Sequence, residues 1–465
     1  MSQIRQLLDL LSKNVDALEK ESAADGTKLP TLDEPFNPAS ESFRSNPVAA
    51  EAACIIRAAA VQLDAILAPP PMALSNMFGG FMGSAALRMC TESHVTEILR
   101  EAGTEGLHVN EIAVKTGVDA QKLARCLRYL ATRHVYKELA PDVFTNNRIS
   151  SILDTGKSSK EIIDDPANKY DNTNGVGAWT SMALDDHFKS AAYHWEVERD
   201  PNNAGSGDPK ACSFAQTVAN GQTHWEHMAR PENAYRRKRF DLVMRFGSRF
   251  PQAILSAFDW KSLPENALVV DVGGGVGTGS MILAREFPNF RFVVQDISPV
   301  EQGLQIWKKE MPDALESGRV KFEAHDFFTP QPKTAASVFL VKRVLHDWSD
   351  EYSSKILKQL RDVATPETRL IIIDSILPYA CHSSTDQLAS QEAPAPLLPN
   401  WGIVNSTVYQ LDLTMMMLFN GQERTVAQFD RLLKSAGWQI KNIHLPSPSR
   451  FEAAVSGSVE AVPIL

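Results

Sequence analysis

Short apolar runs alternate with helical segments along the sequence from about residue 255 onward. The runs ALVVDVG, RFVVQDI, RVKFEAHDF, ASVFLVKRV and RLIIIDSIL are rich in β-branched residues, and a helical or loop segment follows each one. Apolar strands that alternate with helices are typical of a parallel sheet covered by helices on both faces. We therefore predict an α/β fold with a doubly wound sheet for residues 255–465.

The 465 residues leave room for more than this one domain. Residues 1–74 combine an amphipathic helix, a polar linker and an alanine-rich helix, which predicts an N-terminal helical arm. Residues 75–150 contain a short helix, a turn at Gly117, a longer apolar helix and a hairpin around Pro141, which is the order of a winged helix. Residues 151–254 are predicted to form a mainly helical connection.

Two features of these upstream segments allow more than one interpretation. The winged helix could bind DNA through Lys122, Arg125 and Arg128, but we favour a role in dimer packing. The basic cluster RRKR at 236–239 could be a localisation signal. We favour the solvated face of a helix whose apolar side carries Phe240, Val243 and Met244.

Composition narrows the possible partners and the location. The formal charge is −9, from 47 Lys and Arg against 56 Asp and Glu, which argues against binding nucleic acid or an anionic membrane. Five scattered cysteines predict a reduced, cytoplasmic chain. The uncharged stretch from Ala65 to Leu87 is long enough to span a bilayer, but prolines and glycines interrupt it, so we expect two short helices there.

The first predicted strand of the sheet runs into a glycine-rich loop, GGGVGTG at 273–279, before a helix. Glycines let a ligand approach the backbone at the carboxyl end of a strand. The loop lacks the GxGxxG spacing of a dinucleotide fingerprint. Asp296 ends the next strand, where a carboxylate suits the two hydroxyls of a ribose. After the third strand, Asp326 and Phe327 offer an acceptor for an adenine amino group and a ring for stacking.

The fourth strand leads into the loop motif VLHDWSD. Here His346 lies just beyond the carboxyl end of the strand, where open α/β sheets place reacting groups. A single loop histidine is more often structural than catalytic. Its position beside the predicted nucleotide site makes His346 a candidate catalytic residue.

Six ordered motifs together resemble one known family. They are VVDVGGGVG, the acidic end of the second strand, HDFF, VLHDWSD, ILP, and the DLTMMMLFNGQERT block at 412–425. Over about residues 75–445 the chain is similar to S-adenosylmethionine-dependent O-methyltransferases of the plant caffeic acid and isoflavone type and to their fungal secondary-metabolism relatives. The resemblance implies a Rossmann-like class I methyltransferase domain and a homodimer formed through a winged-helix domain.

The resemblance also implies roles for individual residues. His346 matches the general base, and Glu423 and Asp374 match the two acidic residues that flank it, although Asp374 is one methylene shorter than the usual glutamate. S-adenosyl-L-methionine is the implied cofactor and S-adenosyl-L-homocysteine its product, with no metal required. The expected cofactor-binding residues are Asp271, Gly273, Gly275, Asp296, Asp326, Phe327 and Lys342.

Aromatic, methionine and histidine side chains are concentrated upstream of the sheet, and further methionines lie at 415–417. Such side chains are suited to lining a pocket for a small, flat aromatic substrate. The expected pocket residues are Trp179, Met182, His187, Trp225, Met228, Met244, Met416 and Asn420.

We therefore predict an enzyme that transfers a methyl group to a phenolic hydroxyl. A phenol with a pKa near ~10 is protonated at neutral pH, so a histidine base would accept its proton during attack. Two alternatives remain: the same fold used for a non-methylating reaction of the pericyclase or dehydratase kind, or a winged-helix regulator that binds DNA.

Overall fold

The computed structural model describes residues 1–247, 251–297, 300–382, 391–445 and 457–465. The chain forms two compact units. The first comprises residues 1–193 with 224–247, and the second comprises 194–223 with 248–465. The segment predicted as one connection, 151–254, is thus divided between both units.

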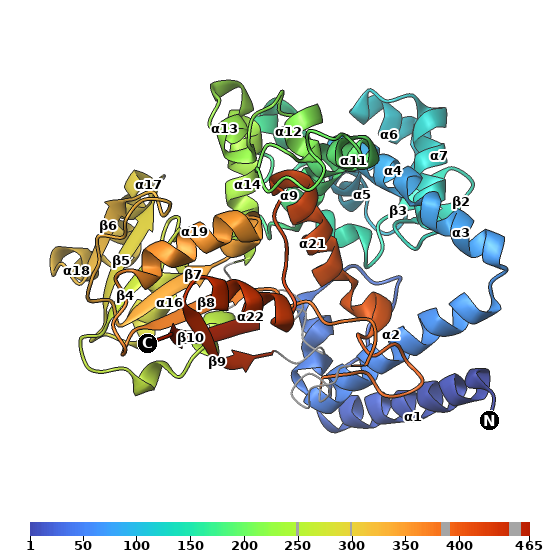
Figure 1. Ribbon diagram of the computed structural model, residues 1–465. Helices are drawn as coiled ribbons and strands as arrows, with labels where there is room; N and C mark the ends of the chain where they lie inside the picture. Colours follow the sequence, from blue (N-terminus) through green and yellow to red (C-terminus); the bar gives the residue numbers. More distant parts are fainter. Residues whose placement is uncertain (248–250, 298–299, 383–390, 446–456) are drawn as a thin grey trace. The chain divides into compact units, whose positions relative to one another are not determined.

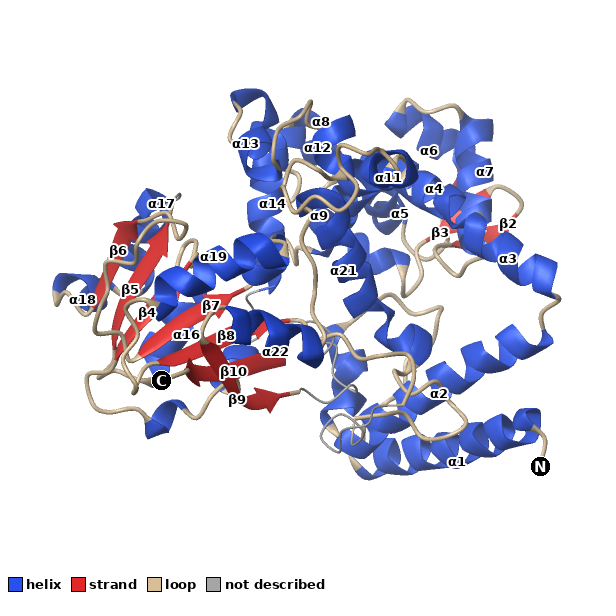
Figure 2. Cartoon of the chain, in the orientation of Figure 1, coloured by secondary structure: helices blue, strands red, loops and turns tan. Residues whose placement is uncertain are grey.

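The second unit is built on a seven-stranded sheet (Figure 2). Its strands, in spatial order, are β6 (Val320–Ala324), β5 (Arg291–Asp296), β4 (Leu268–Val272), β7 (Val338–Lys342), β8 (Arg369–Asp374), β10 (Gly457–Pro463) and β9 (Trp438–His444). The first five are parallel to one another, and β10 is antiparallel to both its neighbours. The five apolar runs of the sequence are these five parallel strands.

Helices cover both faces of the sheet, as predicted (Figure 1). Because successive side chains point to opposite faces, Val270 packs with α19 and α22, whereas Val269 packs with α15 and α16. The helices of this sheet are α15 (Pro251–Leu255), α16 (Thr278–Glu286), α17 (Val300–Glu310), α18 (Pro312–Glu316), α19 (Asp350–Arg361) and α22 (Val426–Ser435).

One strand lies in a segment for which no motif predicts an element. β10 belongs to the tail beyond residue 446, which falls outside the family resemblance, and it inserts between β8 and β9. Val459 and Ala461 of β10 are completely buried, so the tail completes the apolar core on the α19 and α22 side.

Three further helices of the second unit pack together away from the sheet. They are α11 (His194–Glu198), α12 (Ser213–Thr217) and α21 (Ser406–Phe419). Phe214 of α12 is fully buried against Leu418 and Phe419 of α21. This contact attaches residues 194–223 to the unit that contains the sheet.

The first unit contains the predicted winged helix and the helices around it. The winged helix combines three helices, α5 to α7, with a three-stranded sheet in the order β1-β3-β2 whose first strand lies between α5 and α6. Leu123, Leu127 and Leu130 of α7 are buried in its core. Its elements are α1 (Gln3–Ala24), α2 (Pro47–Leu67), α3 (Pro70–Phe78), α4 (Gly80–Glu92), α5 (Val95–Ala102), β1 (Leu107–His108), α6 (Val109–Thr116), α7 (Ala120–Ala131), β2 (Lys137–Ala140), β3 (Val143–Thr145), α8 (Ser159–Asp164), α9 (Val176–Met182), a π-helical turn η4 (Ala183–His187), α10 (Phe188–Ala191), α13 (His224–Met228) and α14 (Ala234–Gly247).

The uncharged stretch from Ala65 to Leu87 is broken as expected. Its residues fall in the end of α2, in α3 and in the start of α4, with Pro69 before α3 and Gly79 after it. No helix in the described part of the chain is long and apolar enough to cross a membrane.

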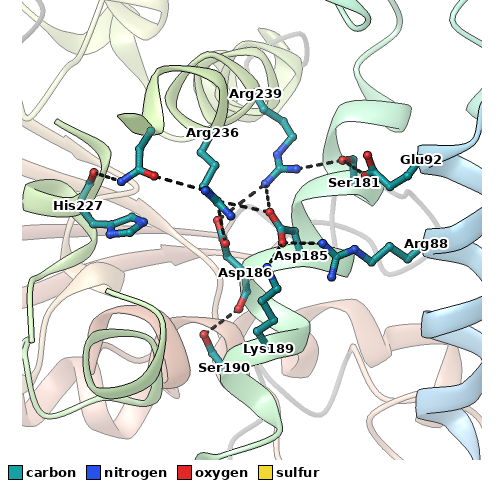
Figure 3. Close-up of polar contacts among 11 residues, drawn as sticks. Arg88, Glu92, Ser181, Asp185, Asp186, Lys189, Ser190, His227, Arg236 and Arg239 are labelled. Atoms are coloured by element: carbon teal, nitrogen blue, oxygen red, sulfur yellow. Dashed lines mark hydrogen bonds and ion pairs between the residues drawn. The ribbon is translucent and has the colours of Figure 1, made fainter. Parts of the chain in front are cut away.

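The prediction of a solvated face for the basic cluster at 236–239 holds for Arg237, which is exposed, but is wrong for Arg239, which is buried. Arg239 is only 4% exposed and donates to Asp185 over 3.1 Å, while Arg236 pairs with Asp186 at 3.1 Å (Figure 3). Arg88 of α4 reaches Asp185 at 2.9 Å. The two buried aspartates lie on the η4 turn, so charge pairs that sequence periodicity does not reveal join both α14 and α4 to this turn. Met244, predicted to point inward, is 45% exposed.

Candidate active site

The glycine-rich loop between β4 and α16 adopts a backbone that depends on glycine. Gly273, Gly275 and Gly277 have φ values of 68°, 56° and 74°, in the left-handed region. A Cβ on Gly273 would come within 2.8 Å of Val344, whereas one on Gly275 would meet nothing within 4 Å. The loop is therefore tightly packed at Gly273 and open at Gly275, which leaves room for a ligand against its backbone.

Two carboxylates anchor this loop. Asp296, at the end of β5, accepts a hydrogen bond from the Gly275 amide at 2.9 Å. Asp271, at the end of β4, is 3% exposed and accepts from the Ser280 hydroxyl at 2.6 Å. Burial raises the pKa of Asp271, and the Ser280 hydrogen bond opposes that rise. Two of the three predicted cofactor-binding aspartates thus lie at the loop.

The other predicted cofactor residues follow β6 and end β7. Asp326 is exposed, and its Oδ1 accepts from the Phe328 amide at 2.9 Å in a local turn. Phe327 packs edge-on against Phe328 and Trp348, with ring centroids 4.9 and 6.0 Å away. Burial lowers the pKa of Lys342 to about 8, with Arg343 adding to the effect and Asp271 and Asp374 opposing it.

His346 lies on a single 3₁₀ turn, η7 (Leu345–Asp347), which follows β7. Its Nδ1 is 2.7 Å from Oε1 of Glu423, and the two side chains are 7% and 0% exposed. Because a carboxylate only accepts hydrogen bonds, Nδ1 carries the proton and the neutral ring has its lone pair on Nε2. Asp347 Oδ1 lies 3.6 Å from Nε2.

Three carboxylates control the protonation of His346. Burial alone would lower its pKa, but Glu423, then Asp347 and Asp374, outweigh burial and raise the pKa to about 9. In turn, burial raises the pKa of Asp347 to about 6 against the opposing effect of His346. His346 is therefore a buried ring with a raised pKa, surrounded by three carboxyl groups.

Asp374 lies differently from Glu423. It ends β8 and is 3% exposed, and neither of its carboxyl oxygens has a hydrogen-bond partner among the described residues. Burial raises its pKa well above the usual range, although His346 opposes the rise. The next residue, Ser375, donates its amide to Glu423 Oε2 at 3.1 Å. Asp374 therefore acts on His346 through its charge, without a hydrogen bond.

Sequence reasoning did not single out several residues that build this site. Asp412 accepts from the Glu423 amide at 2.8 Å, and Asp347 approaches Nε2. Arg424 is completely buried and binds the backbone on either side of His346. Each belongs to a recognised motif, but only the fold brings 345–348 beside 412 and 421–424.

The predicted pocket residues divide between the two units. In the first unit, Met182 and Met228 are 7% and 6% exposed, whereas Trp179, Trp225 and Met244 are 40–45% exposed. In the second unit, Met416 is half-buried, and Asn420 donates to the carbonyls of Ser206 and Asp208, both at 2.8 Å. The Asn420 amide group is thus engaged in holding a loop.

Two histidines of the first unit lie close in sequence to these side chains: His187 ends the η4 turn after α9, and His224 begins α13. Burial lowers the pKa of His187 to about 4 and that of His224 to about 3. His224, which no sequence motif indicated, packs against Phe240 and Trp225 with ring centroids 5.1 and 5.4 Å away. Among the described residues, no group of three or more His, Cys, Asp or Glu side chains is placed to hold a metal ion.

The sheet order and the glycine loop at the end of β4 define a class I methyltransferase fold. Residues 195–439 match the O-methyltransferase domain, and residues 75–156 match the O-methyltransferase dimerisation domain. The chain belongs to the family of S-adenosylmethionine-dependent O-methyltransferases.

Individual relatives agree with this assignment. The chain is 48% identical to 4-O-methyltransferase 1 of Phanerochaete chrysosporium, with 99% of each sequence covered. Mitomycin 7-O-methyltransferase MmcR is 26% identical, with a TM-score of 0.61 over 84% of this chain and 97% of that one. LepI in its complex with SAM has a TM-score of 0.63 at 20% identity, over 88% and 93% of the two chains, and supports the fold alone.

Proposed function

We propose that this O-methyltransferase methylates a phenolic hydroxyl of a small aromatic acceptor, with His346 as the general base. The observation that carries the proposal is the buried pair of His346 Nδ1 and Glu423 Oε1, 2.7 Å apart. This contact leaves Nε2 to take the proton of the acceptor and provides a carboxylate that stabilises the resulting imidazolium.

The basicity of His346 suits a phenolic substrate. A phenol has a pKa near ~10, and the pKa of His346 is raised to about 9. Proton transfer between groups of similar pKa carries little free-energy penalty. The positive charge that forms on the ring during the reaction is stabilised by the nearby carboxyl groups of Glu423 and Asp347. Both groups already lie beside the ring before the reaction begins.

The proposed cofactor site combines the open backbone at Gly275 with the carboxylates of Asp296 and Asp271. Gly275 leaves space in which no protein atom lies near an ideal Cβ, and Asp296 stands beside it. These features fit the adenosine and amino-acid portions of S-adenosylmethionine, which supplies an electrophilic methyl group on a sulfonium. We assign Gly273, Asp326, Phe327 and Lys342 to the same site.

The proposed acceptor side chains are the apolar residues predicted from the sequence. Trp179 and Trp225 expose flat rings in the first unit, and Met182 and Met228 lie in the same group of helices. The half-buried Met416 and the catalytic pair belong to the second unit. The abundance of aromatic and thioether surface supports a flat aromatic acceptor.

We also assign a homodimer to the chain, formed through the dimerisation domain. The helices α3 and α4 expose Met77, Phe78, Phe81 and Met82 by 52–80%. Exposed apolar surface of this extent is typical of an interface. All four residues lie near the start of the matched dimerisation segment, residues 75–156, and a second copy of the chain is the partner that fits this surface.

The test uses S-adenosylmethionine with a labelled methyl group and a panel of phenols. We expect label transfer by the wild type and a loss of about 10²–10⁴-fold in kcat for His346→Ala, the range for a general base. A rate within tenfold of the wild type would refute the assigned base. Conversion of acceptors without label transfer would favour the non-methylating alternative.

A further inference from the structure

The turn that carries His346 begins in a strained backbone. Arg343, directly after β7, has a φ of 53°, a left-handed conformation that is unfavourable for a residue with a side chain. The three-residue turn η7 begins two residues later, at Leu345. A strained, short turn keeps one position only when contacts with neighbouring segments fix it. Such contacts exist on the segment 421–424, which also carries Glu423.

Gly421 provides the first of these contacts by allowing close approach. A Cβ at this position would lie 2.2 Å from the His346 carbonyl oxygen and 2.7 Å from the Asp347 carbonyl carbon. The neighbouring Gln422 amide donates to that same His346 oxygen at 2.9 Å. The two backbones therefore touch at the catalytic histidine, and glycine is the residue that fits between them.

Arg424 provides the second contact through its guanidinium group. Nη1 donates to the Leu345 carbonyl at 2.9 Å, and Nη2 donates to the Trp348 carbonyl at 2.8 Å. These two carbonyls flank His346 on both sides. Nε pairs with Asp350 at 2.8 Å, and Nη2 also reaches the Ser353 hydroxyl at 3.1 Å, both in α19.

Backbone contacts extend the same connection to β8. The Leu377 amide donates to the Arg424 carbonyl at 3.0 Å, and Ile376 bridges Arg424 in parallel register. Arg424 thus joins the end of β8, the start of α19 and both sides of the η7 turn. A planar group with five donors is suited to such a junction, whereas the single ammonium of lysine reaches fewer acceptors.

We propose that Gly421 and Arg424 are positioning residues that hold the η7 turn against segment 421–424, so that His346 stays within hydrogen-bonding distance of Glu423. Neither residue touches the reacting atoms. The proposal rests on the assigned role of His346 as the base, and it explains why the histidine and its carboxylate partner, 77 positions apart, meet at 2.7 Å.

The decisive measurement is the pKa of His346, followed by NMR in protein with isotope-labelled histidine, with the signal assigned through His346→Gln. In the wild type we expect titration near pH 9. In Gly421→Ala and Arg424→Lys we expect a pKa lower by at least one unit, because His346 moves away from Glu423. The variant kcat should fall at least tenfold, while S-adenosylhomocysteine affinity stays within threefold.

Gly80→Ala is the matched control, because a Cβ there meets nothing within 4 Å. It should leave the His346 titration unchanged. Asp350→Ala removes one partner of Arg424 at a half-exposed position, so it tests the same connection even if the variants in the core fail to fold. It should shift the His346 titration in the same direction by a smaller amount. Wild-type titration of His346 in both Gly421→Ala and Arg424→Lys would overturn the proposal, whether or not His346 proves to be the base.

Discussion

His346 and Glu423 form a buried pair whose closest atoms, Nδ1 and Oε1, are 2.7 Å apart. One belongs to the turn after β7 and the other to the segment before α22, so the pair joins two crossover connections at one edge of the sheet. Open α/β sheets bind ligands at the carboxyl ends of their strands. The pair therefore stands where a reacting group is expected.

The pH dependence of the reaction should report this pair. Because the pKa of His346 is raised to about 9, the ring is mostly protonated at pH 7 and cannot accept a proton. The neutral fraction grows about tenfold per pH unit below the pKa, so kcat/KM should rise from pH 6.5 to about 9. Glu423→Gln removes the carboxylate that contributes most to raising the pKa and should move this rise to lower pH, with kcat reduced. If kcat/KM of Glu423→Gln rose over the same pH range as in the wild type, the assignment of His346 and Glu423 as the base and its partner would be contradicted.

Asp374 should matter less than Glu423. Its carboxyl oxygens have no hydrogen-bond partner among the described residues, and it affects His346 through charge alone. We expect Asp374→Asn to change kcat by less than about tenfold, against the larger loss for Glu423→Gln. Parallel steady-state assays of the two variants test this order. An equal loss in both would show that Asp374 orients the ring directly.

Cofactor affinity should depend on Asp296. Its carboxylate accepts from the Gly275 amide at 2.9 Å and lies beside the open part of the loop. Asp296→Ala would remove the hydrogen bond that this carboxylate is expected to accept from a ribose hydroxyl of the cofactor. Loss of a hydrogen bond to a charged group costs about 1.5–3 kcal/mol, so the cofactor affinity should fall by about 10–150-fold. Calorimetric titration with S-adenosylmethionine measures the change. Glu316→Ala, on α18 of the same unit, is the control, and affinity unchanged in Asp296→Ala would refute the site.

Arg239 should contribute strongly to stability. Its guanidinium is almost fully buried and pairs with Asp185, as Figure 3 shows. Removing one partner of a buried pair leaves an unpaired charge and costs about 3–5 kcal/mol. Urea unfolding of Arg239→Ala should show this loss. Arg237→Ala, at an exposed position of the same helix, should stay within about 0.5 kcal/mol of the wild type, and equal effects would show that the buried pairing is unimportant.

The assigned homodimer predicts a response at α3. Phe78 is 69% exposed in the single chain, so Phe78→Glu should place a charge in the interface and weaken association. Light scattering coupled to size-exclusion chromatography should give a dimer for the wild type and a larger monomer fraction for the variant. Ile163→Glu, at a 51% exposed position of α8 outside the matched dimerisation segment, is the control. A wild-type monomer at all concentrations would exclude the dimer.

Local sequence pattern was sufficient to predict the doubly wound sheet, the glycine loop and His346 as a candidate base. Strand alternation and loop glycines are local properties, because they follow from backbone geometry and from which side chains must be buried. The winged helix and the break between α3 and α4 could be predicted from the sequence for the same reason. The motif resemblance also named Glu423, without showing how it meets His346.

Tertiary structure alone decided which polar groups meet. Arg239 pairs with Asp185, and Arg424 contacts the turn of His346, although these residues lie far apart in the chain. Asp374, in contrast, has no hydrogen-bond partner among the described residues. These contacts affect stability and pKa values because the groups are buried, and a desolvated charge must either pair with another group or change its pKa. Periodicity predicts which face of a helix is apolar, but it does not predict which two buried charged side chains will form a pair.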